Sequence, residues 1–271
     1  MTEFRLHHLT WPQAQERLET ASVGIIPIGA NEQHGPHLQM GTDWRIAERL
    51  AEETVIAADG LALMTPPLPV GFSPHHMGFA GTLTARAETI TALLDDIVDS
   101  LQTHGLRRFI IMNGHGGNLA FLPAWTAELR RRLGCAISII HWSLMGRDVV
   151  VDNAASEVIG HACEVETGLA MDIAPELVVH DQLGGPAPLR NPEHHLVRGH
   201  AIPERAVGAF VPRDFSELTA NGALGNPAKA TRDAGHRLRT VVVERSVEVI
   251  RHMAATEVPG DRPPGQLSTG W

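Results

Sequence analysis

The first group of side chains able to bind metal follows the hydrophobic run VGIIPIG. It contains Glu32, His34 and Asp43. Carboxylate oxygens and imidazole nitrogens suit Zn²⁺, Mn²⁺ or Fe²⁺, and the two oxygens of Asp43 allow it to bridge two ions. The stretch therefore predicts a metal site. The alternative is that Asp43 only begins a helix, with His34 and His37 as solvated turn residues.

A second group, NGHGGN at residues 113–118, lies between the hydrophobic run RRFIIM and a predicted helix. His115 is placed where ligands gather at the end of a strand. The backbone N–H groups of Gly116 and Gly117 are candidates for binding an oxyanion or a substrate carboxylate. The spacing matches neither the dinucleotide-binding G-x-G-x-x-G motif nor a P-loop. A plain tight turn is the alternative, although it explains only the glycines.

The third group is HACEVETG at residues 161–168. Helical spacing from His161 places Glu166 in an apolar stripe. A buried carboxylate is costly unless it is paired or bound to metal, so we expect a cation next to Glu166. Glu164 falls on the other face and is expected to be solvated, while Cys163 is expected to be a small buried residue rather than a nucleophile or ligand.

A loop at residues 71–82, GFSPHHMGFAGT, follows the second predicted strand. Its Gly, Pro, His and Phe content suits a segment that folds over a substrate. A surface loop with incidental histidines is the alternative. A tryptophan after the fourth predicted strand is a further candidate for the pocket wall, or else a packing residue. The predicted substrate-contacting side chains are Phe72, His75, His76 and Trp142.

The elements that must position these groups are predicted by hydrophobic patterning. Near-continuous apolar runs indicate buried strands, and apolar residues at three-to-four spacing indicate helices. Their alternation predicts an α/β fold, a three-layer α/β/α sandwich with a mainly parallel sheet, in which ligands bind at the carboxyl ends of the strands. The predicted strands are residues 23–28, 61–66, 108–112 and 136–141, and the predicted helices 43–58, 87–103 and 119–133.

Length and composition fit this architecture. The 271 residues predict one domain at 1–258, with long loops over 181–226, a short strand at 209–211, a last helix at 228–254 and a flexible tail at 259–271. A net charge of -9 without a long basic block argues against nucleic acid or membrane as the main partner. Two cysteines and the lack of an apolar leader or transmembrane run predict a cytoplasmic protein.

Taken together, GANEQHGPHLQMGTD, NGHGGN and HACEVETG resemble the creatininase (creatinine amidohydrolase) family. The similarity runs from LTWPQAQERLE to GALGNPAKAT. It implies a three-layer sandwich, a centre of two divalent metal ions (Zn, Mn or Fe), and a homo-oligomer, commonly a hexamer. The metal ligands implied by the motifs are Glu32, His34, Asp43 as the bridge, and His115.

One departure concerns the second motif. Creatininase proper has NGHYEN there, with a glutamate that binds metal, whereas this chain has Gly117. In relatives with NGHGGN the glutamate of the third motif looks like the replacement, which makes Glu166 the fifth ligand. The resemblance thus transfers the fold and the site but not creatinine as the substrate. Other branches of the family deformylate formamidopyrimidines, cleave a modified peptide or hydrolyse keto-inositols.

The predicted activity is therefore hydrolysis of a cyclic or linear amide C–N bond in a small polar substrate by a metal-bridged hydroxide. His161 is the candidate proton carrier, because imidazole titrates near neutral pH; the alternative is a residue that only caps or packs. Three rival functions stay open: a C–C or lactone hydrolase of a cyclic sugar ketone, a mononuclear metal isomerase or oxidoreductase, and a metal-dependent binding module.

Overall fold

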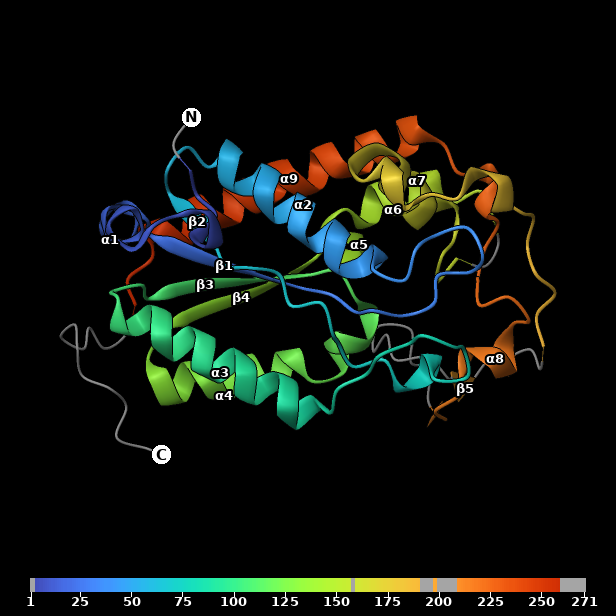
Figure 1. Cartoon of the computed structure of the whole chain (residues 1–271), viewed down its shortest axis with the longest axis horizontal. Helices are drawn as coiled ribbons and strands as arrows, with labels where there is room; N and C mark the ends of the chain where they lie inside the picture. Colours follow the sequence, from blue (N-terminus) through green and yellow to red (C-terminus); the bar gives the residue numbers. More distant parts are fainter. Residues whose placement is uncertain (1–2, 157–158, 191–196, 199–208, 259–271) are drawn as a thin grey trace.

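A four-stranded parallel sheet forms the centre of the molecule (Figure 1). The computed structural model describes residues 3–156, 159–190, 197–198 and 209–258. The strands lie in the order β2-β1-β3-β4, with each predicted strand present. The second strand is shorter than predicted because two prolines, which lack the N–H that a ladder needs, follow Thr65. The bounds are β1 (Val23–Ile28), β2 (Ala62–Met64), β3 (Arg108–Asn113) and β4 (Ala136–His141).

Helices cover both faces of the sheet, which confirms the predicted three-layer sandwich (Figure 1). Successive residues of a strand point to opposite faces, so Ile110 and Met112 pack into one core and Phe109 and Ile111 into the other. The first core is completed by α2 (Thr42–Ala57), α7 (Glu164–Ile173) and α9 (Arg232–Ala255), and the second by α3 (Ala87–Thr103) and α4 (Leu122–Leu133).

Shorter elements surround these layers. Where a helix was predicted from residue 119, Gly116–Ala120 form a 3₁₀ helix and α4 starts at Leu122. The last helix likewise starts after a 3₁₀ turn at Pro227–Lys229. The predicted strand near residue 209 is present as β6, and the predicted tail 259–271 lies outside the described residues. The other elements are α1 (Trp11–Thr20), α5 (Trp142–Met145), α6 (Arg147–Asn153), α8 (Phe215–Leu218), β5 (Val197–Arg198) and β6 (Ala209–Phe210).

Within the described part of the chain, no helix is both long and apolar enough to cross a membrane.

The start of α7 corrects one prediction. Glu164 is buried rather than solvated, with 2% of its surface exposed. Its Oε1 accepts a hydrogen bond from the backbone N–H of Ala155 (3.1 Å), and its Oε2 accepts one from that of Asn226 (2.8 Å). Helical spacing shows which residues share a face, but it does not show that loops from elsewhere cover the second face. Cys163 is buried as predicted, and burial raises the pKa of its thiol to about 11.

Candidate metal centre

The three predicted motifs converge beyond the carboxyl ends of the strands. The loop after β1 supplies two of the predicted ligands, the first turn of α2 one, the loop after β3 one, and α7 one. All of these side chains are buried. They are Glu32, His34, Asp43, His115 and Glu166.

Asp43 lies in the middle of the cluster and faces a different histidine with each oxygen. Its Oδ1 is 3.0 Å from Nε2 of His34, and its Oδ2 is 3.0 Å from Nδ1 of His115. Glu32 Oε1 lies 3.2 Å from the same Nδ1 of His115. On the other side, Glu166 Oε1 lies 3.8 Å from His34 Nε2. Two groups of ligand atoms therefore meet at one carboxylate, as a bridged pair of ions requires.

Backbone carbonyls orient both histidines. Nε2 of His115 donates to the carbonyl oxygen of Phe72 (3.0 Å), and Nδ1 of His34 donates to that of Glu32 (3.1 Å). A histidine that donates from one ring nitrogen has its other nitrogen available for a metal. In both rings that second nitrogen is the one that faces the carboxylates. The alternative of a solvated His34 is wrong, and His37 is buried too, beside Thr167.

The residue set fits divalent cations. Both oxygens of Glu32 and Oδ2 of Asp43 are buried and have no hydrogen-bond partner among the described residues. Such buried oxygens are costly without a cation. Burial alone would lower the pKa of His115, but the carboxylates of Glu32 and Asp43 outweigh it and raise that pKa to about 10. The protein therefore attracts positive charge to this point, and a mixed carboxylate and imidazole set suits Zn²⁺, Mn²⁺ or Fe²⁺.

Glu166 is aimed inward by a sharp turn before α7. Its Oε2 accepts a hydrogen bond from the backbone N–H of Ala162 (2.6 Å), which leaves Oε1 toward His34. Ala162 has φ of 47°, a left-handed conformation that costs a non-glycine residue free energy. The inward direction that helical spacing predicts for Glu166 is thus observed, although α7 itself begins only at Glu164.

A cavity of about 80 Å³ opens beside these ligands. Trp142 is held in its wall by a hydrogen bond from Nε1 to the carbonyl oxygen of Gly114 (3.2 Å). The Phe72 ring is not in the wall. It packs against Phe121, with ring centroids 6.2 Å apart. The predicted residues that do line the cavity are His75, His76, Gly116, Gly117, Trp142 and His161, together with the metal-site residues Glu32, Asp43, His115 and Glu166.

The lining also includes residues that the motifs did not indicate, among them His141 and Phe215. Phe215, in α8, stacks on His76 with ring centroids 4.2 Å apart and an interplanar angle of 19°. Its only sequence signal was the helix start at Asp214, whose side chain caps α8 and also accepts a hydrogen bond from the backbone of Gly78 (2.8 Å). Among the described lining residues there is no lysine or arginine.

The backbone at Gly117 leaves no room for the glutamate that creatininase proper has at this position. A Cβ at this position would lie 2.3 Å from Nε2 of His115 and 2.4 Å from the carbonyl oxygen of Phe72. A glutamate side chain in its place would therefore overlap with the two atoms, His115 Nε2 and the Phe72 carbonyl oxygen, whose hydrogen bond orients His115. The departure from NGHYEN thus matches the local backbone.

We expect Gly117→Ala to weaken metal binding by about 10- to 100-fold, because it disturbs a partner that orients a ligand. Titration with Zn²⁺ in a competing chelator measures this change. Gly185→Ala is the control, since a Cβ there meets nothing within 4 Å. Unchanged zinc affinity in Gly117→Ala would contradict the assigned role of the Phe72 carbonyl.

Comparison with known proteins places the chain in a family. The creatininase model, described as creatinine amidohydrolase, matches residues 7–250. A mycofactocin precursor peptide peptidase of Mycobacterium ulcerans (strain Agy99) is 32% identical over 96% of this chain and 90% of its own length. The creatinine amidohydrolase of Pseudomonas putida is 26% identical over 90% of this chain and 94% of its own.

Solved creatininase structures have the same fold as this chain. A mutant creatininase described as the Zn–Zn type superposes with a TM-score of 0.79 and 24% identity, covering 94% of this chain and 100% of that one. The sandwich, the cluster of carboxylates and histidines able to hold metal, and the family match together place the chain among hydrolases. The chain belongs to the creatininase family, as the three motifs predicted.

Proposed function

We propose that this protein is a dinuclear metal-dependent hydrolase that cleaves an amide C–N bond in a small polar substrate. The proposal rests mainly on the position of Asp43, which directs one carboxylate oxygen toward His34 and the other toward His115. Glu32 and Glu166 complete the two groups of ligands. Two divalent ions bound there, Zn, Mn or Fe, supply an activated water as nucleophile and polarise the scissile carbonyl.

His161 is placed to move a proton. Its Nε2 donates to the backbone carbonyl of Gln33 (2.6 Å), so Nδ1 carries the lone pair and faces the cluster, 3.8 Å from Glu32 Oε1. Burial, together with the nearby His34, lowers the pKa of His161, which keeps the ring neutral at neutral pH. In the proposed reaction Nδ1 accepts a proton and passes it to the leaving nitrogen.

Backbone amides are placed to hold the substrate. Gly116 and Gly117 line the cavity, and neither amide donates a hydrogen bond to another residue in the described part of the chain. We propose that they orient the scissile carbonyl or a substrate carboxylate. Because no described lining residue is a lysine or an arginine, an acidic group on the substrate would otherwise face only the metal site.

Two of the relatives support an amide bond as the target. One is a peptidase and another an amidohydrolase, and both names describe cleavage of C–N bonds. The cavity of about 80 Å³ admits a small molecule or the end of a larger one. The rival within the family chemistry is a C–C or lactone hydrolase of a cyclic sugar ketone. We also propose a homo-oligomeric, cytoplasmic enzyme, with the hexamer that the resemblance implies.

The test joins metal analysis to product analysis. Purified protein loaded with Zn²⁺, Mn²⁺ or Fe²⁺ is expected to hold two ions per chain by mass spectrometry of the elements. A panel of lactams, formamides, short peptides and keto-cyclitols is then screened by mass spectrometry, and turnover is expected to release an amine or ammonia. Products without released nitrogen would favour the sugar-ketone reaction, and one ion per chain would contradict the dinuclear centre.

A further inference from the structure

Gln33 lies between two of the proposed ligands, Glu32 and His34, and only 5% of it is exposed. Its side-chain amide has a single possible orientation. Oε1 accepts a hydrogen bond from the backbone N–H of Gly35 (2.9 Å), and Nε2 donates to the carbonyl oxygen of Gly222 (3.1 Å). A backbone N–H can only donate and a carbonyl can only accept, so the two partners together identify each end of the amide.

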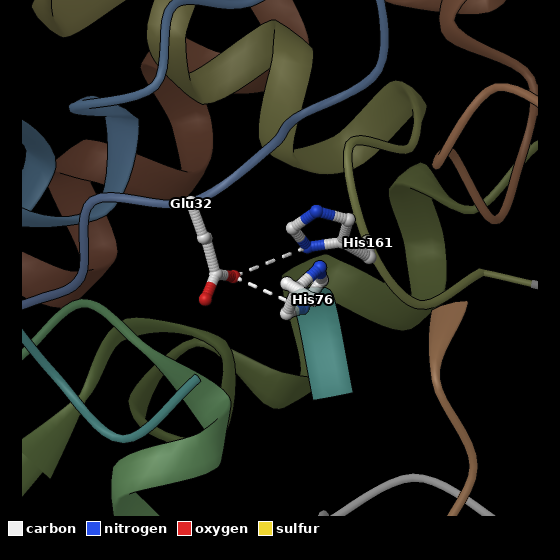
Figure 2. A group of neighbouring side chains, drawn as sticks. All are labelled: Glu32, His76 and His161. Atoms are coloured by element: carbon white, nitrogen blue, oxygen red, sulfur yellow. Dashed lines mark ion pairs between the residues drawn. The ribbon is translucent and has the colours of Figure 1, made fainter. Parts of the chain in front are cut away.

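This orientation decides where the proton of His76 is. Nε2 of Gln33 lies 2.8 Å from Nδ1 of His76. Because the amide nitrogen can only donate, Nδ1 must be the acceptor, and a neutral ring then has its proton on Nε2. That nitrogen lies 3.2 Å from Oε1 of Glu32, a close contact drawn as a dashed line in Figure 2, although Oε1 accepts no hydrogen bond from the described residues. His76 therefore directs an N–H group toward the edge of the metal centre without completing a hydrogen bond there.

The same residue also fixes the proton of His161 on Nε2, but this ring turns its other nitrogen toward Glu32. Its backbone carbonyl accepts from Nε2 of His161 (2.6 Å), so Nδ1 has no proton and faces Glu32. The two imidazole rings lie side by side, with centroids 4.4 Å apart and an interplanar angle of 47°. Figure 2 shows both rings turned toward the Glu32 carboxylate.

We propose that Gln33 is a positioning residue that fixes the Nε2–H tautomer of both histidines. Because the two rings turn different nitrogens toward Glu32, His76 offers a donor at Nε2 and His161 an acceptor at Nδ1. The inference rests on the proposed function. The donor at His76 binds an acceptor atom of the substrate beside the metal centre, while the acceptor at His161 receives the proton. It follows that His76 is not a metal ligand, although one of its ring nitrogens lies within 4.8 Å of ligand atoms of Glu32 and His161.

The backbone near Gly222 is shaped around this amide. Gly222 has φ of 86°, which favours glycine, and a Cβ there would lie 1.7 Å from Oε1 of Gln33. An alanine at position 222 would thus displace the amide without changing Gln33 itself. This provides a second, independent way to disturb the tautomers.

The test reads the tautomers directly. Zinc-loaded protein labelled with ¹⁵N-histidine is examined by long-range ¹H–¹⁵N correlation NMR, which identifies the protonated nitrogen of each ring. The wild type is expected to show His76 protonated at Nε2 and His161 at Nε2. In Gln33→Glu, which has no N–H to donate, the proton of His76 is expected to move to Nδ1, with about a 10²-fold loss in kcat as for removal of one preorganised donor. Two ions per chain are expected to remain.

Gly222→Ala is expected to disturb the same ring. Its control is Gly105→Ala. Position 105 also has a positive φ (99°), but a Cβ there meets nothing within 4 Å, so this variant introduces the backbone strain without a steric clash. A wild-type His76 protonated at Nδ1 would overturn the proposal, even if Gln33→Glu did not fold. So would a Gln33→Glu protein with unchanged tautomers and kcat. If the tautomers are as expected but no amide is cleaved, the proposed function fails and the role of Gln33 stands.

Discussion

Asp43→Ala is expected to lose both metal ions and, with them, turnover. Each oxygen of Asp43 serves one of the two ligand groups, so removal of this side chain leaves neither group complete. Metal catalysis contributes several kcal/mol of transition-state stabilisation, so kcat should fall by at least about 10³-fold. Metal content is measured on the purified variant, and kcat under saturating added Zn²⁺.

A carboxylate far from the centre serves as the control. Asp96 lies exposed on α3, and Asp96→Ala should keep two ions and wild-type kcat. Thermal unfolding of both variants separates loss of ligands from loss of the fold. If Asp43→Ala retained two ions per chain, the bridging assignment would be wrong.

His161→Ala is expected to keep both ions while kcat falls by about 10²- to 10⁴-fold, the usual contribution of a positioned acid or base. The reason is geometric. Nδ1 faces the cluster, but the five proposed ligands provide both groups of donor atoms without it. Added imidazole is expected to restore part of the rate, since the substitution leaves room beside Glu32.

The metal content of the same variant tests a second role for this residue. A ring nitrogen of His161 lies within 4.8 Å of ligand atoms of His34 and Glu166. Loss of one ion in His161→Ala would show that the ring is a ligand rather than a proton carrier. His104→Ala, at an exposed position, is expected to change neither metal content nor rate.

Much of this arrangement could be predicted from the sequence because it depends on short-range patterns. The runs of buried β-branched residues indicate the parallel sheet, and strand ends of such sheets are where ligands gather. Glu32 and His115 follow directly after two of these strands. The inward face of Glu166 follows from helical spacing within a single element.

Other features depend on contacts between distant segments. Glu164 lies on a helix face that periodicity assigns to solvent, yet Ala155 and Asn226 cover it. Phe215 reaches the cavity from a short helix with no motif of its own. Gln33 stands inside a recognised motif, but its function depends on Gly222, which lies 189 positions further along the chain.

Because the proposed ligands come from several segments of the chain, metal binding is expected to raise the free energy of unfolding. The five side chains come from separate parts of the fold, between Glu32 near the first strand and Glu166 in α7. In an unfolded chain the segments that carry Glu32, His115 and Glu166 are far apart, so the ions bind the native state in preference to the unfolded one. Ions held at 100 times their dissociation constant would add about 2.7 kcal/mol to the free energy of unfolding for each site. The centre would thus act as a reversible cross-link between the sheet and its covering helices.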